Sequence, residues 1–192
     1  MNPATIVTAL RIALAPAFYL LFTTSAASGT IGVLPAISLV LLFLIMEVTD
    51  ALDGAVARRM NSVSDFGKLF DPFADSLARL TYFFSFVMTG IMPGWVFLLI
   101  LYRDLVVSFI RVLAMKKGVA MAAQLSGKIK AIVYAIAGGA GIATVLSASF
   151  LPKTLADTIG AVTDVTFLLC AATAVWTLID YSLAYRRMAE KA

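Results

Sequence analysis

The sequence predicts an all-α integral membrane protein with six transmembrane helices. Three observations support this fold class: the composition is apolar, the apolar residues gather in six long runs, and positive charges lie between alternate runs. Of the 192 residues, 61% are hydrophobic and only 14% are charged, whereas a soluble domain carries about 25% charged residues. The mean hydropathy is +0.97. The length predicts one domain, which we take to span residues 1–192.

Each apolar run is long enough to cross a membrane, because an α-helix needs about 20 apolar residues to span the hydrocarbon core. Short breaks that contain glycine, proline, serine or asparagine separate the runs, and these residue types end helices. The expected spans are Ile6–Thr23, Ile31–Arg58, Gly67–Thr89, Gly94–Met115, Gly127–Phe150 and Leu155–Tyr185.

Basic residues mark one side of the predicted membrane protein. They lie after the second, fourth and sixth runs, whereas the opposite side has only Lys153. Cytoplasmic loops are enriched in lysine and arginine, so we expect six spans with both termini in the cytoplasm. A bacterial inner membrane is the default location. The cations on this side are Arg58, Arg59, Lys68, Lys116, Lys117, Lys128, Lys130, Arg186, Arg187 and Lys191.

Acidic residues inside the second and third runs are the unusual feature of the sequence. Each charge deep in a span costs about 2.5–3.5 kcal/mol, so four without partners would cost on the order of 10 kcal/mol. Asp50 and Asp53 stand at i and i+3, and Asp71 and Asp75 at i and i+4, so each pair shares one helix face. A short connection makes these helices antiparallel neighbours whose carboxylates can converge. Carboxylate oxygens suit Mg²⁺ or Mn²⁺, and four can hold two ions for in-line displacement at phosphorus.

Small residues and one arginine accompany the acids. Gly54, Ala57 and Gly67 leave the helix faces bare, so a base or a diphosphate could approach the backbone there. Arg58 could bind a phosphate oxygen. Alternatively, the small residues serve in helix packing and Arg58 is a topology charge.

The segment from Asp50 to Asp75 resembles the signature of the CDP-alcohol phosphotransferase family. It reads Asp50-Ala-Leu-Asp53-Gly54-Ala-Val-Ala57-Arg58 and, after eight residues, Gly67-Lys-Leu-Phe-Asp71-Pro-Phe-Ala-Asp75. All eight fixed positions of the signature match at the family spacing. The six-span layout extends the resemblance to the whole chain.

The resemblance implies a fold, a reaction and a set of site residues. The fold is a six-helix membrane protein, typically a homodimer. The reaction transfers a substituted phosphoryl group from a CDP-alcohol to a second alcohol and releases CMP. The implied metal ligands are Asp50, Asp53 and Asp71, with Asp75 facing the metals as the general base. The implied CDP-site residues are Gly54, Ala57, Arg58 and Gly67.

A second group of cations indicates where an acceptor alcohol could bind. Arg103 and Arg111 lie eight residues apart in the fourth run, and Lys128 and Lys130 open the fifth. They could surround a phosphorylated acceptor, although the lysines could also serve topology alone. This stretch is similar to bacterial phosphatidylglycerophosphate synthases, which use CDP-diacylglycerol and glycerol 3-phosphate. The chain departs from many of them at Ser76, where they carry lysine, and at Thr5, where they usually carry asparagine.

The resemblance therefore predicts phosphatidyl transfer from CDP-diacylglycerol to glycerol 3-phosphate, and it leaves alternatives open. Inositol phosphate or serine could be the acceptor, or a CDP-choline-type donor could react with diacylglycerol. We expect no nucleic-acid partner. An ion transporter would also use intramembrane acids, but these acids gather on one side, and Asp164 and Asp180 are too sparse to continue a path. A membrane scaffold would explain none of the acids.

Overall fold

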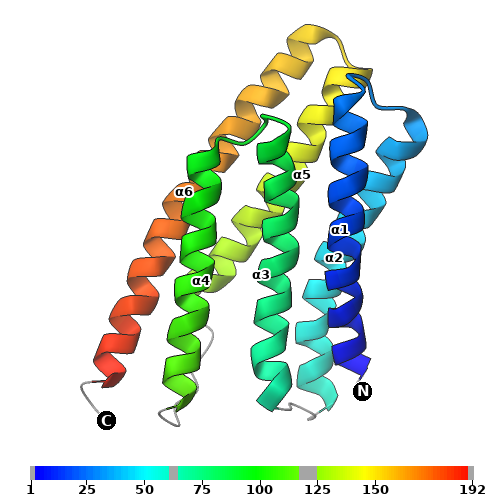
Figure 1. The fold of residues 1–192 in the computed structure, drawn as a ribbon. Helices are drawn as coiled ribbons and strands as arrows, with labels where there is room; N and C mark the ends of the chain where they lie inside the picture. Colours follow the sequence, from blue (N-terminus) through cyan, green and yellow to red (C-terminus); the bar gives the residue numbers. More distant parts are fainter. Residues whose placement is uncertain (1–2, 61–64, 117–124, 190–192) are drawn as a thin grey trace.

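The computed structural model describes residues 3–60, 65–116 and 125–189, and it describes side chains for residues 9–49, 73–115 and 125–188. The described residues form six α-helices and no strand, which confirms the all-α class (Figure 1). The helices are α1 (Pro3–Ala27), α2 (Val33–Met60), α3 (Asp65–Met88), α4 (Gly94–Lys116), α5 (Leu125–Phe150) and α6 (Lys153–Ala189).

The helices begin and end within a few residues of the predicted spans. Gly29 lies in the connection between α1 and α2, and Gly90 lies in the connection between α3 and α4. Both have a φ of 74°, a left-handed backbone conformation that glycine adopts without steric strain. The longest helix is α6, which has 37 residues. At a rise of about 1.5 Å per residue, it is longer than the roughly 30 Å hydrocarbon core, and it runs obliquely to α4 (Figure 1).

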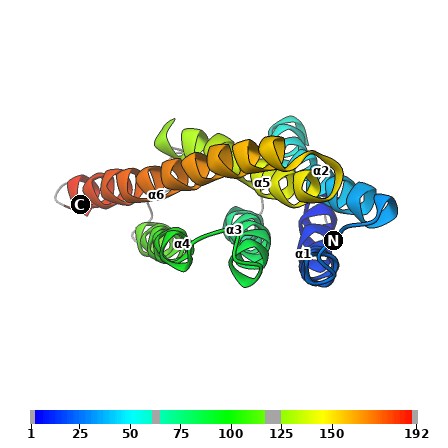
Figure 2. The same ribbon diagram turned by 90° about the horizontal axis from the view of Figure 1, so that it is seen from above.

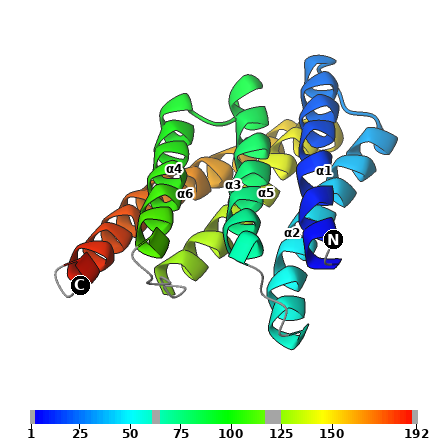
Figure 3. The same cartoon turned by 60° about the horizontal axis from the view of Figure 1, so that its bottom comes forward.

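Three described helices are long and apolar enough to cross a membrane by length and composition. They lie within Ala9–Ala27, Leu125–Phe150 and Lys153–Met188, and Val33–Thr49 is a shorter apolar helix. These helices indicate a membrane protein. The two ends of the chain lie at the same end of the bundle as the last turns of α2 and α4 (Figures 1 and 3).

The bundle has two layers when it is seen from above (Figure 2). One layer holds α1, α3 and α4, and the other holds α2, α5 and α6. The most extensive contacts join α5 to α6 and α1 to α3, and α4 packs closely on α6. This arrangement places α3, α4, α5 and α6 around one shared space at the end of the bundle that holds the chain termini.

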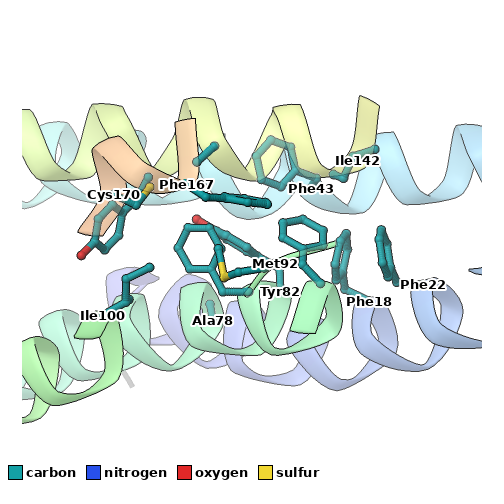
Figure 4. Packing of buried hydrophobic residues seen from close by; sticks show 14 of the residues in the cluster. Phe18, Phe22, Phe43, Ala78, Tyr82, Met92, Ile100, Ile142, Phe167 and Cys170 are labelled. Atoms are coloured by element: carbon teal, nitrogen blue, oxygen red, sulfur yellow. The ribbon is translucent and has the colours of Figure 1, made fainter. Parts of the chain in front are cut away.

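Aromatic side chains fill the space between the two layers (Figure 4). The ring of Tyr82 in α3 lies 5.6 Å from the ring of Phe43 in α2, so these antiparallel helices touch through their side chains. Two glycines of α5 make room for the rings. A Cβ at Gly138 would lie 2.7 Å from Phe43, and a Cβ at Gly141 would lie 2.5 Å from Phe86. Close packing of this kind fixes the two layers relative to each other.

Candidate active site

A cavity of about 260 Å³ lies where α3, α4, α5 and α6 meet. Among the described side chains on its wall, five are cations and two are carboxylates, so together they carry a net charge of +3. A concave, positively charged wall attracts anions. The charged residues are Asp75, Arg79, Arg103, Asp104, Arg111, Lys128 and Lys130.

Helical spacing explains how each helix contributes to this cavity. In α4, Arg103, Val107 and Arg111 stand at i, i+4 and i+8 and line the wall together. In α5, Gly127 and Lys130 stand three residues apart and do the same. Residues three or four apart share one face of an α-helix, so two turns of each helix suffice to present these groups.

A buried carboxylate joins two of the cations. The Asp104 Oδ1 atom accepts a hydrogen bond from Arg103 Nη1 at 2.8 Å and another from Lys130 Nζ at 3.0 Å. The Arg103 Nε atom donates to Thr177 Oγ1 at 2.8 Å. All four residues are buried. Arg103 is therefore held by α4 and α6, and Lys130 is held against α4.

An aromatic ring lies against the two arginines of α4. The guanidinium carbon of Arg103 is 5.5 Å from the ring centroid of Tyr181, and that of Arg111 is 5.4 Å away. These distances lie within the range of cation–π attraction. The Arg111 Nη2 atom also donates a hydrogen bond to the Tyr181 hydroxyl at 3.0 Å. Gly127 permits this approach, because a Cβ there would lie 2.9 Å from the same hydroxyl.

A second ion pair stands at the cavity edge and reaches α1. Arg11 Nη1 donates a hydrogen bond to a carboxylate oxygen of Asp75 in α3. Arg11 Nε lies 3.4 Å from Thr49 Oγ1 in α2. The arginine is buried, whereas the Asp75 side chain is 27% exposed. One side chain of α1 thus contacts α2 at the residue before the first signature acid and α3 at the last signature acid.

The structure brings the predicted acceptor-binding cations together with one signature acid. Arg103, Arg111, Lys128 and Lys130 line the same cavity as Asp75. The other signature residues lie in α2 and α3, but their side chains are outside the described residues, so their convergence stays a prediction. These residues are Asp50, Asp53, Gly54, Ala57, Arg58, Gly67 and Asp71.

Among the cavity residues that received no role from the sequence, three are charged or contact the arginines of α4. Arg79 follows Asp75 by four residues, and that spacing was the signal for a shared helix face. Asp104 stands inside an apolar run beside Arg103, where an acid needs a cationic partner. Tyr181 carried no signal, because it comes from a helix that lies far along the chain and tyrosine is common near membrane surfaces.

The fold and the cavity define a class: a helical membrane protein with a positively charged cavity that contains one acid of the Asp50–Asp75 segment. Comparison with known families gives the particular one. The profile of the CDP-alcohol phosphatidyltransferase family matches residues 1–179. The chain belongs to this family. Enzymes of this family generally use divalent metal ions.

Curated relatives agree with this assignment. The chain is 41% identical over 133 residues to a CDP-diacylglycerol–glycerol-3-phosphate 3-phosphatidyltransferase of Treponema pallidum, covering 66% of this chain and 62% of that protein. It is 34% identical over 137 residues to the Bacillus subtilis protein of the same name, covering 68% and 71%. A Mycoplasma genitalium protein with this name is 35% identical over 111 residues, covering 56% and 47%. The chain thus matches less than two thirds of the Treponema protein's length.

Proposed function

We propose that this chain transfers the phosphatidyl group of CDP-diacylglycerol to glycerol 3-phosphate and releases CMP. One observation carries the proposal: the cavity that contains Asp75 of the family signature also contains Arg103, Arg111, Lys128 and Lys130. A phosphorylated acceptor bound by these cations would lie beside the signature acids. The printed names of the Treponema and Bacillus relatives support the same reaction.

The cationic wall suits a phosphate group better than a neutral alcohol. Arg103 and Lys130 are buried and share one carboxylate oxygen. In the described part of the chain, the Arg111 guanidinium contacts the ring and hydroxyl of Tyr181 but no carboxylate. Arginine and lysine bind phosphate through charge-assisted hydrogen bonds, which are roughly twice as strong as neutral ones. An acceptor that carries a phosphate monoester would match this charge.

Asp75 is placed to act on the acceptor hydroxyl in this proposal. Its carboxylate is partly exposed on the cavity wall, so it could accept the proton as the hydroxyl oxygen attacks the lipid-bearing phosphorus. The new phosphorus–oxygen bond forms as the bond to CMP breaks, and CMP leaves with the bonding electrons. Asp75 would serve as a general base by this geometry.

The donor set of the signature fits a divalent metal centre. Asp50, Asp53, Asp71 and Asp75 would hold two Mg²⁺ or Mn²⁺ ions, because hard cations prefer carboxylate oxygens. Bound ions would neutralise the diphosphate and stabilise charge on the attacking and leaving oxygens. In this proposal, Gly54, Ala57, Arg58 and Gly67 line the CDP site.

We also propose six membrane spans with both termini and the active site facing the cytoplasm, in a bacterial inner membrane. Support comes from the position of both chain ends at one end of the bundle (Figure 3). In the described residues, the first turns of α5 carry Lys128 and Lys130 and the last turn of α6 carries Arg186 and Arg187, all at this end of the bundle. Lysine and arginine are enriched on the cytoplasmic side of membrane proteins. The homodimer implied by the resemblance belongs to the same proposal.

The test is CMP release by the purified protein with CDP-diacylglycerol and Mg²⁺. Glycerol 3-phosphate, inositol phosphate, inositol, serine and phosphatidylglycerol are supplied in separate reactions. Release with glycerol 3-phosphate alone supports the proposal. Release with another acceptor alone contradicts the proposed acceptor and retains the reaction class. Release with none of them, together with product formation from CDP-choline and diacylglycerol, would contradict the proposed donor. It would show that the CDP-linked substrate carries the headgroup and that the lipid is the acceptor.

A further inference from the structure

We propose that Asp104 is a positioning residue that sets the spacing of Arg103 and Lys130 for the phosphate of the acceptor. The inference rests on the proposed function, because it assigns a phosphorylated ligand to this cavity. Asp104 is not part of the Asp50–Asp75 signature, and its negative charge alone would repel an anion.

The geometry that carries the inference is a shared oxygen. Asp104 Oδ1 accepts from Arg103 of its own helix at 2.8 Å and from Lys130 of α5 at 3.0 Å. Since both donors bind one atom, the distance between the two cations is limited by their contacts with it. Without Asp104, the two positive groups would repel each other. The carboxylate therefore keeps two like charges close together on one wall of the cavity.

Other contacts hold each cation from a second side. Arg103 Nε donates to Thr177 of α6 at 2.8 Å, and Lys130 Nζ lies 4.8 Å from the ring centroid of Tyr134. Arg103 thus uses Nε for Thr177 and Nη1 for Asp104. In the described part of the chain, its Nη2 group makes no hydrogen bond, so two N–H donors are left for a ligand in the cavity.

Stability alone does not explain this arrangement. The second carboxylate oxygen, Asp104 Oδ2, is buried and has no hydrogen-bond partner within the described part of the chain. A buried acceptor left unpaired costs about 1–3 kcal/mol. Replacement of buried ion pairs by apolar residues is often neutral or stabilising. This cluster leaves one buried oxygen unpaired and binds both cations through the other.

The substitution Asp104→Asn distinguishes a positioning role from simple charge attraction, because the two predict opposite changes in the affinity for phosphate. The variant raises the net charge of the described cavity wall from +3 by one unit. If the cavity only attracts anions, the variant should bind phosphate more tightly. If Asp104 positions Arg103 and Lys130, it should bind phosphate more weakly, by about tenfold or more.

The experiment is isothermal titration calorimetry of the full-length protein in detergent with glycerol 3-phosphate and with inorganic phosphate. Asp164→Asn is the matched control, because Asp164 lies in α6 with an exposed side chain and is not on the cavity wall. Weaker binding in Asp104→Asn with unchanged binding in Asp164→Asn supports the proposal. Equal or tighter binding in Asp104→Asn overturns it.

A second variant keeps the test informative if Asp104→Asn does not fold. Asp104→Glu leaves the cavity charge unchanged but moves the carboxylate by one methylene. Positioning predicts weaker phosphate binding for Asp104→Glu, and binding equal to the wild type would overturn the proposal. Because no CDP-lipid is present, the result does not depend on turnover. A wild-type protein that binds phosphate but releases no CMP with glycerol 3-phosphate would defeat the proposed function and leave the role of Asp104 intact.

Discussion

Arg11 of α1 and Asp75 of α3 form an ion pair at the edge of the cationic cavity. The arginine is buried and the aspartate is partly exposed. Arg11 also reaches Thr49, the residue before the first signature acid. A planar guanidinium can serve two partners at fixed angles, which an ammonium cannot do. The pair thus ties the acid that we propose as general base to both of its neighbouring helices.

We predict that Arg11→Lys lowers kcat by about tenfold or more, since small displacements of a catalytic group have effects of this size. Lysine keeps the positive charge but lacks the separate Nε and Nη1 donors with which Arg11 contacts Thr49 and Asp75. KM for both substrates should change little. Steady-state CMP release measures this effect, with Lys153→Met as the control, because Lys153 is an exposed cation at the opposite end of the bundle. A wild-type kcat in Arg11→Lys would contradict the role of the pair.

Arg111→Ala should raise KM for glycerol 3-phosphate more than KM for CDP-diacylglycerol. Arg111 lines the cavity and contacts Tyr181, and the loss of one charge-assisted contact to phosphate costs about 1.5–3 kcal/mol. That cost corresponds to roughly ten- to a hundredfold in binding. Initial rates with each substrate varied in turn measure the two constants. Equal increases in both constants would show that Arg111 serves the fold instead of the acceptor.

Gly127→Ala should weaken the acceptor site without a change in its charge. The new Cβ would lie 2.9 Å from the Tyr181 hydroxyl, which accepts the hydrogen bond from Arg111. The ring must shift, and Arg111 shifts with it. We expect a higher KM for glycerol 3-phosphate. Gly160→Ala is the matched control, because nothing lies within 4 Å of its new Cβ. If the two variants have the same KM, the contact between Gly127 and Tyr181 does not shape the site.

The sequence predicted the helices well and their packing poorly, for one physical reason. Apolar runs and turn residues determine where a membrane helix begins and ends, and they act locally. Neighbours in the bundle depend on side-chain shape, so the fit of Phe86 against Gly141 could not be anticipated. The sequence marks Arg103 and Arg111 as costly charges in an apolar run, because that signal is local. It does not indicate that the ring of Tyr181 lies against both of them.

The signature acids give a prediction about metal. Asp71→Asn should abolish turnover, because it removes a proposed metal ligand, and the protein should still insert and fold. Chelation of the wild-type protein with EDTA should also abolish turnover, and added Mg²⁺ or Mn²⁺ should restore it. CMP release is the measurement, with Asp164→Asn as the matched control for loss of one acid outside the site. Full activity of Asp71→Asn, or turnover that persists in EDTA, would contradict a metal centre at these acids.

Two glycines of α5 test how the layers pack. Alanine usually favours a helix over glycine by about 1 kcal/mol, so Gly→Ala should stabilise α5 wherever space allows. At Gly139 the nearest atom is 3.8 Å from the new Cβ, and we expect a neutral or stabilising effect. At Gly141 the new Cβ would lie 2.5 Å from the fully buried ring of Phe86. Overpacking of this kind costs about 1–3 kcal/mol.

Thermal unfolding of both variants in the same detergent measures this difference. Gly141→Ala should lower the unfolding temperature, and Gly139→Ala should not. The cavity lies at one end of the bundle, away from these glycines in the chain, so phosphate binding at temperatures well below unfolding should persist in Gly141→Ala. If both variants unfold at the wild-type temperature, the ring of Phe86 has room to move, and close packing between α3 and α5 does not hold the two layers together.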